Sequence, residues 1–217
     1  MGLITTESCE RLINFYESQG IAVNYFEDSW LGRKLKLDKK EFFGISIGRK
    51  IFLANRKIKT ELPFNTFALL LHEGIHTKNF IDTGLRFGLD YFSPQLPMGL
   101  LCIVLTVILL ILNGFSILQL GLSIFYLGVS LAPWTANKRF RIELQAYIAE
   151  LAVCQWLGKD DEDTIRQITR TLSGFRYWYM CVPIDAYCNL LHVATHLPKL
   201  DEVADPTGLL AEGKKLL

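Results

Sequence analysis

The sequence predicts a mainly α-helical protein with a small β-sheet, an α+β fold that is interrupted by a two-helix transmembrane hairpin. Apolar residues recur at helical spacing in several long segments, whereas short segments rich in β-branched and aromatic residues lie ahead of Pro63. The segment from Met98 to Trp134 is almost continuously apolar. These observations divide the chain into an N-terminal half (residues 1–96), a hairpin (residues 97–134) and a C-terminal helical half (residues 135–217).

The N-terminal half is expected to begin with a helix and to continue into short strands. Apolar residues at helical spacing predict a helix from Glu7 to Ser18. A second helix is expected from Pro63 to Phe80, because proline lacks only a donor that a first helical turn leaves unpaired anyway. Strands are expected over residues 21–26, 34–37, 42–47 and 50–55, the last two joined by a turn at Gly48-Arg49.

The apolar segment predicts two membrane-spanning helices. No Asp, Glu, Lys or Arg occurs between Tyr91 and Asn137. A bilayer core requires about 20 apolar residues per helical span, so the segment is long enough for two, and Asn113-Gly114 supplies a break. We expect the helices to run from Met98 to Leu112 and from Phe115 to Pro133. The alternative is a hairpin buried in the core of a water-soluble domain.

Basic residues follow the apolar segment at once, at Lys138, Arg139 and Arg141. By the positive-inside rule they place both ends of the hairpin in the cytoplasm. We therefore expect an integral membrane protein that contacts the lipid bilayer and has its catalytic part on the cytoplasmic side. Three helices are expected after the hairpin, over residues 139–157, 162–172 and 183–196.

The charge balance excludes one class of partner. The chain has 23 Lys and Arg residues against 22 Asp and Glu residues, which gives a formal net charge of +1. Because no long basic run marks a groove for phosphates, we expect no nucleic-acid partner.

The run His72-Glu73-Gly74-Ile75-His76 matches HExxH. Histidines four residues apart lie on one face of a helix, so both imidazoles can bind one zinc ion, Zn²⁺. The intervening Glu73 is the expected catalytic base, because a carboxylate there can take the proton of a zinc-activated water that attacks a peptide carbonyl. The sequence therefore indicates a zinc-dependent endopeptidase with a peptide or protein substrate. The alternative is a structural histidine pair at the end of a core helix.

A catalytic zinc usually has three protein ligands. The best third candidate is Glu143, because Glu143, Tyr147 and Glu150 share one face of a predicted helix, and Glu150 is the alternative ligand. A solvent-exposed acidic face would have the same spacing. Two membrane crossings would return this helix to the side of the membrane that holds the HExxH helix.

These motifs resemble the membrane-embedded gluzincins, which include HtpX-like heat-shock peptidases and CAAX prenyl proteases. Those enzymes have HExxH followed by a Lys/Arg-Asn element, and Lys78-Asn79 is similar. Their ligand helix commonly reads Glu-x-x-Ala-Asp, whereas this chain has Glu143, Ala146 and then Tyr147. The resemblance implies a zincin-like catalytic domain, two membrane helices between HExxH and the glutamate ligand, and a substrate bound as an added strand along a sheet edge near residues 42–55.

A second histidine pair, His192 and His196, lies in a predicted helix. We expect His196 to be a second catalytic residue that donates to the oxyanion of the scissile carbonyl, although His192, Arg176, Tyr177 and Tyr179 compete for this role and a structural histidine pair is an alternative. Two non-peptidase functions stay open. One is a non-catalytic membrane scaffold or binding protein that retains the fold. The other is a membrane metal-dependent oxygenase, although such di-iron sites use about eight histidines and this chain has four.

Overall fold

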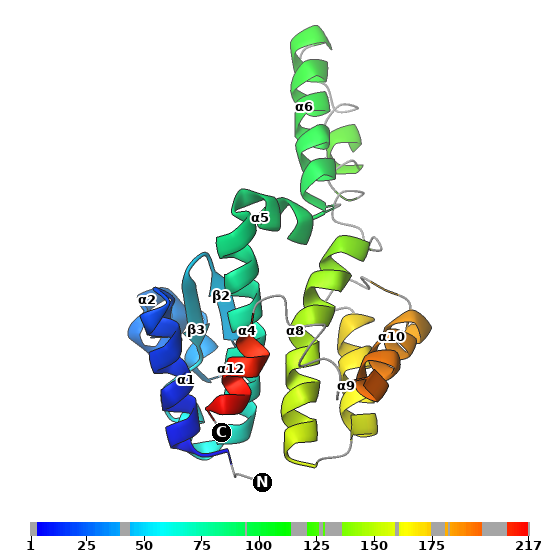
Figure 1. The fold of residues 1–217 in the computed structure, drawn as a ribbon. Helices are drawn as coiled ribbons and strands as arrows, with labels where there is room; N and C mark the ends of the chain where they lie inside the picture. The colour runs from blue at the N-terminus through cyan, green and yellow to red at the C-terminus, as the bar shows by residue number, and fades with distance from the viewer. Residues whose placement is uncertain are drawn as a thin grey trace.

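The computed structural model describes residues 4–39, 44–93, 95–113, 121–125, 128, 136–158, 161–174, 181, 183–196 and 208–216. These residues form a mainly helical structure with one small sheet of three strands (Figure 1). The predicted α+β class is therefore confirmed. The helices that follow the sheet along the chain form the larger part of the fold, and two of them, described below, hold the candidate site.

The N-terminal half contains the sheet and the helices around it. The sheet has the strand order β1-β3-β2, in which β1 is parallel and β2 antiparallel to the central strand β3. The turn between β2 and β3 contains Gly48 with φ of 61°, a left-handed conformation that glycine adopts without strain. The elements are α1 (Thr6–Ser18), β1 (Ala22–Tyr25), η1 (Phe26–Asp28), α2 (Trp30–Lys34), η2 (Leu37–Lys39), β2 (Gly44–Ile47), β3 (Lys50–Leu53), α3 (Ile58–Glu61) and α4 (Pro63–Thr83).

One predicted strand is wrong. Residues 34–37 were expected to be extended, but α2 ends at Lys34 and η2 begins at Leu37. Between them Lys36 has φ of 54°, which is incompatible with a strand. The other three predicted strands are confirmed within the described residues, with ends that differ by one or two positions.

Helix α4 is the centre of the fold. It packs against α1 and the sheet on one side and against α8 (Asn137–Trp156) on the other. Phe67, Leu70 and Leu71 of α4 are fully buried in the core, together with Tyr16 of α1. Since both faces of α4 are covered, the histidines that it carries lie inside the molecule.

Gly74, the third residue of the HExxH motif, is required by the contact between α1 and α4. The Tyr16 hydroxyl donates a hydrogen bond of 2.9 Å to the carbonyl of Leu70. A Cβ atom at position 74 would lie 2.1 Å from this hydroxyl oxygen and 2.6 Å from Cζ of the same ring. Only glycine allows the tyrosine ring to approach the α4 backbone this closely.

Gly74→Ala is expected to lower the free energy of unfolding by about 2 kcal/mol, because the added methyl forces Tyr16 out of a filled core. At an exposed position in the interior of a helix, replacing glycine by alanine raises the free energy of unfolding by up to about 1 kcal/mol. Gly88→Ala in α5 (Leu85–Tyr91) is the matched control, because a Cβ there meets nothing within 4 Å. Urea unfolding of the three proteins measures the difference. Equal stability of the two variants would contradict the close contact.

The described residues of the C-terminal half are mainly helical, as predicted. Helix α8 returns alongside α4 in the opposite direction (Figure 1). Helices α9 and α10 pack on each other and on α8, and the last helix packs on α4. The elements after α4 are α5, α6 (Gln95–Asn113), α8, α9 (Asp161–Leu172), α10 (Pro183–His196) and α12 (Leu209–Lys215).

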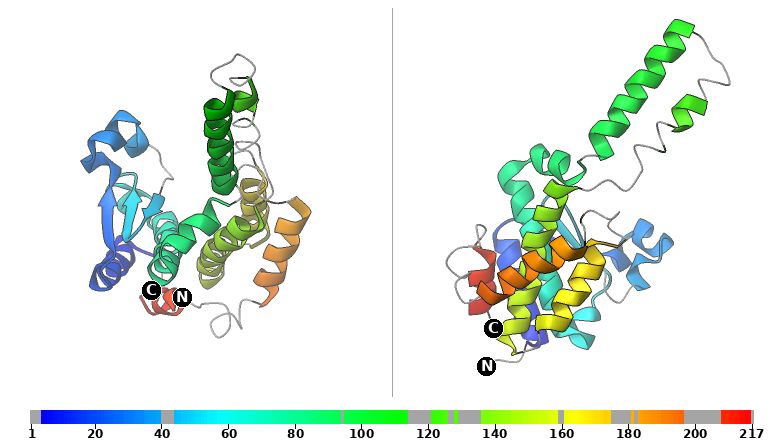
Figure 2. Two further views of the ribbon diagram at one scale, coloured as in Figure 1. Left: turned by 90° about the horizontal axis from the view of Figure 1, so that it is seen from above. Right: turned by 90° about the vertical axis from the view of Figure 1, so that its right-hand side faces the viewer.

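The expected membrane-spanning hairpin and integral-membrane location are wrong. Within the described residues, no helix is both long enough and apolar enough to cross a membrane. The first expected span falls in α6, which projects from the rest of the fold (Figure 2). Apolar side chains of α6, such as those of Leu100 and Ile111, are exposed. The second, Phe115 to Pro133, lies mostly outside the described residues. The expected bilayer contact and cytoplasmic orientation rested on this hairpin and lose their basis with it.

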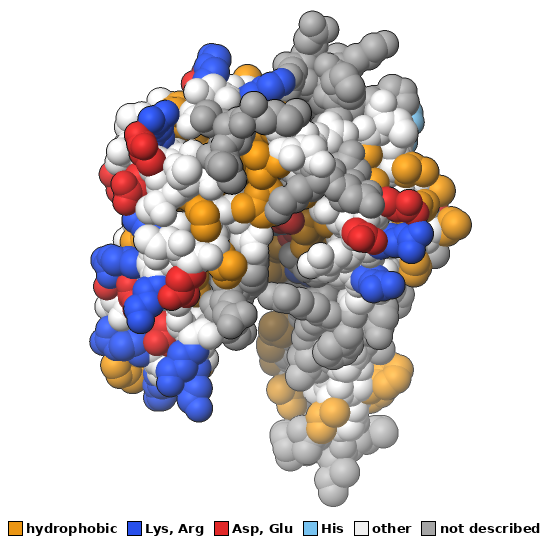
Figure 3. All heavy atoms as spheres, turned by 90° about the horizontal axis from the view of Figure 1, so that it is seen from below, with side chains coloured by type: hydrophobic (Ala, Val, Ile, Leu, Met, Phe, Trp, Pro, Cys, Tyr) orange, Lys and Arg blue, Asp and Glu red, His pale blue; other side chains and the backbone are white. Residues whose placement is uncertain are grey.

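Charged side chains are unevenly distributed over the surface. In the view of Figure 3, acidic and basic side chains are interspersed over the side of the molecule that holds α1, and apolar side chains are more frequent toward α9 and α10. Several of the charges pair with each other, as when Arg56 contacts Asp28 at 2.7 Å and Glu27 at 3.0 Å. The interspersed signs agree with the small net charge of the sequence.

Candidate metal centre

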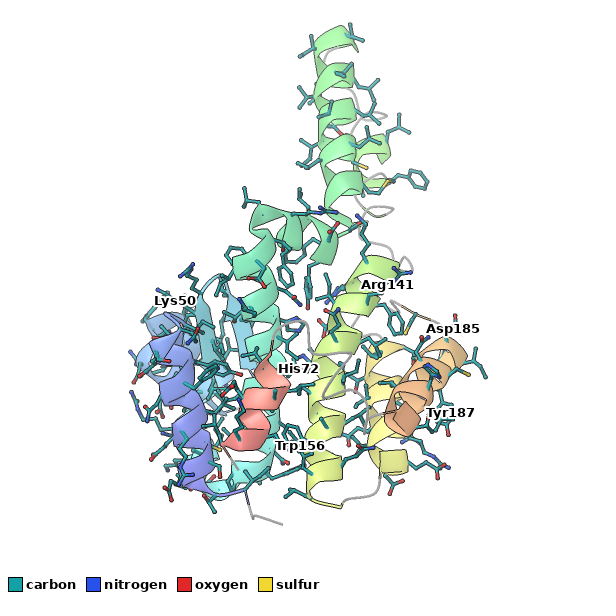
Figure 4. The ribbon with its side chains drawn as sticks, in the orientation of Figure 1. Lys50, His72, Arg141, Trp156, Asp185 and Tyr187 are labelled. Carbon is teal, nitrogen blue, oxygen red and sulfur yellow. The ribbon has the colours of Figure 1, made fainter. Side chains whose placement is uncertain are left out.

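Three buried side chains converge between α4 and α8. The Nε2 atoms of His72 and His76 lie 3.2 Å apart, and Oε2 of Glu143 lies 3.6 Å from each of them. Figure 4 shows His72 on α4, the helix that lies alongside α8. All three residues are at most 5% exposed. Their ligand atoms are close enough together to hold one metal ion. Within the described residues, this is the one group of His, Cys, Asp and Glu side chains with that property.

The spacing of these three atoms fits a tetrahedral zinc ion. Bonds of about 2.0–2.1 Å at tetrahedral angles separate neighbouring ligand atoms by about 3.3–3.4 Å. The observed separations of 3.2, 3.6 and 3.6 Å are close to these values, and a point about 2.1 Å from all three atoms lies about 0.6 Å outside their plane, as the metal does in a tetrahedral site. Two neutral imidazoles and one carboxylate also form a ligand set typical of catalytic zinc.

The electrostatics of the group are those of a site that attracts a cation. Burial alone would lower the pKa of His72, but the carboxylates of Glu143 and Glu150 outweigh it and raise the pKa well above its usual value. Burial alone would raise the pKa of Glu143, but His72 and His76 lower it well below its usual range. Oε2 of Glu143 is buried without a hydrogen-bond partner in the described residues. An unpartnered buried carboxylate oxygen beside two imidazoles is costly unless a cation neutralises it.

The local sequence explains how each side chain reaches the site. His72 and His76 are one helical turn apart in the middle of α4, so their rings project from the same face. Glu143 lies in the second turn of α8, the helix that packs on this face. The two candidate third ligands are now distinguished, because Glu143 faces the Nε2 atoms and Glu150 does not.

Glu150 lies behind His72. Its Oε1 is 2.8 Å from Nδ1 of His72, on the opposite side of the ring from Nε2. A carboxylate at this position favours the tautomer with the proton on Nδ1, which leaves the lone pair of Nε2 for a metal. The ring of Tyr147 packs edge-on against His72 with centroids 4.7 Å apart and fixes the orientation of the imidazole. Tyr147 therefore supports His72 through its ring, where the gluzincin pattern has an aspartate.

Glu150→Ala is expected to weaken zinc binding about 10- to 100-fold, because loss of the partner of a ligating histidine has this effect. Glu150→Gln keeps an acceptor oxygen at Nδ1 and is expected to weaken binding by less than Glu150→Ala. Titration against a competing zinc chelator measures both affinities. Equal affinity of wild type and Glu150→Ala would show that this contact does not orient His72.

Tyr91 is a residue of the site that sequence reasoning missed. Its hydroxyl donates a hydrogen bond to Oε1 of Glu143, and its ring lies edge-on to His76 with centroids 5.9 Å apart. The Arg139 guanidinium lies over the Tyr91 ring, 4.8 Å from the ring centroid. Tyr91 belongs to α5, which covers this side of the site. In the sequence it adjoins the apolar segment, and no local pattern connects it to Glu143.

The other side of the site opens into a cavity of about 450 Å³. His72, Glu73 and Tyr147 line its inner end. Gly44, the first residue of the edge strand β2, lines it as well. Because Glu73 lines the same cavity as His72, a substrate in this cavity would lie beside one candidate metal ligand and the expected base.

The second histidine pair is not part of the described group. His192 is exposed on α10. His196 is the last residue of α10, and its side chain lies outside the described part of the chain, as do Arg176, Tyr177 and Tyr179. The carbonyl of Ala194 accepts a hydrogen bond of 3.1 Å from Gln155, twelve residues along α8 from Glu143 or roughly 18 Å along the helix axis. The catalytic role of His196 stays a prediction.

The fold and the site together define an α+β protein with a buried His-His-Glu group beside a cavity. No protein-family model, curated protein or solved structure matches the chain. The resemblance to gluzincins therefore rests on the motifs alone.

Proposed function

We propose that this protein is a zinc-dependent endopeptidase in which His72, His76 and Glu143 hold the metal and Glu73 is the catalytic base. One observation carries the proposal: three buried ligand atoms converge with the spacing of a tetrahedral face, next to a glutamate that lines an open cavity. A structural metal site would normally have four protein ligands, whereas a catalytic site keeps one position for water or substrate. Within the described residues the group has three.

The chemistry that zinc supplies when bound is Lewis acidity, which makes water a better nucleophile and a carbonyl a better electrophile. The chain itself supplies the proton transfer. Glu73 is 7% exposed and adjoins the first ligand on α4, so its carboxylate can accept the proton of the attacking water and deliver it to the leaving amide nitrogen. The water oxygen forms a bond to the carbonyl carbon and the C–N bond breaks. Tyr91 and Glu150 keep Glu143 and His72 in place during the reaction.

The position of the sheet edge favours a peptide as the substrate. β2 is an edge strand, and its first residue, Gly44, lines the cavity. An extended peptide can pair with such an edge through main-chain hydrogen bonds. Of the two strands within residues 42–55, β3 is central and β2 is at the edge, so β2 is the strand to which we propose that the peptide is added.

The test combines metal content with hydrolysis. Wild type purified and loaded with zinc should hold one zinc per chain and cleave an unfolded protein such as reduced casein. Removal of the metal by a chelator should stop cleavage, and zinc should restore it. A preference for iron over zinc would contradict the metal assignment, because a two-histidine, one-carboxylate set also suits Fe(II) oxygenases.

The second candidate is a non-catalytic binding protein that retains the metal group. The buried, well-supported ligands would serve such a protein equally well, but a metal-binding role gives no reason for Glu73 to face the cavity. Stoichiometric zinc without cleavage of any unfolded protein would favour this candidate over the peptidase.

A further inference from the structure

The cavity beside the metal group extends well beyond it. From His72 it continues along α4 as far as Phe64, and along α8 from Tyr147 as far as Cys154. Eight residues of helix separate Phe64 from His72, which corresponds to about 12 Å. Helix α9 closes the outer side with residues that include Gln167. A space of this length accepts a fully extended long side chain of a peptide bound at the metal.

Among the described residues that line the cavity, the carboxylates are not balanced by any Lys or Arg. Of the described residues that line it, Glu73 and Glu150 are the carboxylates, and none is Lys or Arg. Glu150 lies midway along the α8 side, and its side chain is 28% exposed. The other polar residues of the wall are neutral, and those on α9 share one helical face at Thr164, Gln167 and Thr171. The α9 wall thus offers hydrogen-bonding groups but no positive charge.

We propose that this cavity selects a Lys or Arg side chain of the peptide substrate beside the scissile bond, and that Glu150 and Gln167 are the specificity-determining residues. This proposal rests on the proposed peptidase function. A basic side chain extending from the metal group would pass the Glu150 carboxylate, and the hydroxyl and amide groups of α9 would receive its end. Beyond the metal group, an acidic side chain would meet the carboxylate of Glu150, and no described residue of the lining is a Lys or Arg that would compensate its charge. Like charges in a partly enclosed space raise the free energy of the bound state.

Gln167 gives the sharper test, because Glu150 also orients His72. Gln167 lies on α9, which supplies none of the metal ligands, so a change there acts on the cavity alone. Gln167→Lys places a positive charge in the cavity wall. Asp163→Asn is the matched control, because it changes the net charge by the same amount on the same helix at an exposed residue that does not line the cavity.

The experiment digests an unfolded protein with zinc-loaded enzyme and identifies every cleaved bond by mass spectrometry. For wild type we expect cleavage next to Lys or Arg to exceed cleavage next to Asp or Glu about tenfold, after correction for the composition of the substrate. Gln167→Lys is expected to reduce this ratio about tenfold, and Asp163→Asn to leave it at the wild-type value. Thr171→Lys provides a second test at the same wall and should reduce the ratio in the same direction.

The possible failures are distinguishable. Absence of any cleavage by the zinc-loaded wild type overturns the proposed function and the preference with it. Cleavage with equal frequency next to basic and acidic residues overturns the preference and leaves the peptidase function intact. Circular dichroism verifies that Gln167→Lys and Thr171→Lys are folded. If both folded variants keep the wild-type ratio of cleavage next to basic and acidic residues, the role of the α9 wall is overturned.

Discussion

Glu73→Gln is expected to reduce the rate of peptide hydrolysis about 1,000-fold while the variant still binds one zinc ion. The amide keeps the size of the side chain but cannot accept the proton of the attacking water, and a positioned general base contributes about 10²- to 10⁴-fold. Glu73 is not one of the three residues whose ligand atoms converge, so the variant should still bind the metal. Steady-state hydrolysis and metal analysis of the same sample measure both quantities.

Asp82→Asn is the matched control for this change. It replaces a carboxylate by an amide on the same helix, at an exposed residue whose partner is Lys78 at 3.0 Å. We expect the control to retain wild-type activity. Two results would contradict the assignment of Glu73: hydrolysis by Glu73→Gln within tenfold of wild type, or loss of the zinc from this variant.

Glu143→Gln is expected to abolish stoichiometric zinc binding, because the amide removes the negative charge of the third ligand from a buried site. Zinc at about 1,000 times its dissociation constant should stabilise the wild type by about 4 kcal/mol, since the ion binds only the folded state. For a chain of this size that corresponds to a rise in melting temperature of about 8–16 °C. The variant should show no rise.

Thermal unfolding with and without zinc measures this effect, and the metal-free melting temperature of Glu143→Gln reports separately whether the variant folds. Glu162→Gln on α9 is the control, because Glu162 is exposed and pairs with Arg166 at 2.6 Å outside the site. A folded Glu143→Gln protein that zinc stabilises as much as wild type would exclude Glu143 as a ligand and would reopen the choice of third ligand.

The helices were largely predictable because their signals are local. The spacing of apolar residues predicted α1, α4, α8, α9 and α10 to within a few residues of their ends. The strand predicted at residues 34–37 failed because four residues carry too little periodicity to distinguish a strand from a turn, and Lys36 adopts a left-handed conformation there.

The membrane hairpin failed for a different reason. Hydropathy measures how apolar a segment is, but a membrane span also requires a continuous helix of sufficient length. No helix in the described ranges meets both conditions. Glu143 does lie beside the histidines, but two membrane crossings are not the reason.

The sequence by itself determined the pairing of His72 with His76 and the position of Glu73 next to them, because one turn of one helix fixes all three. Only the tertiary structure decided that Glu143 and not Glu150 completes the triangle, that Tyr91 holds its carboxylate, and that α9 closes the cavity. The contact of Tyr91 with Glu143 joins residues 52 positions apart, and the contact of His72 with Glu150 joins residues 78 positions apart. They depend on how α5, α8 and α9 pack against α4, and the packing of separate helices is set by the shape of a whole core, which no local pattern encodes.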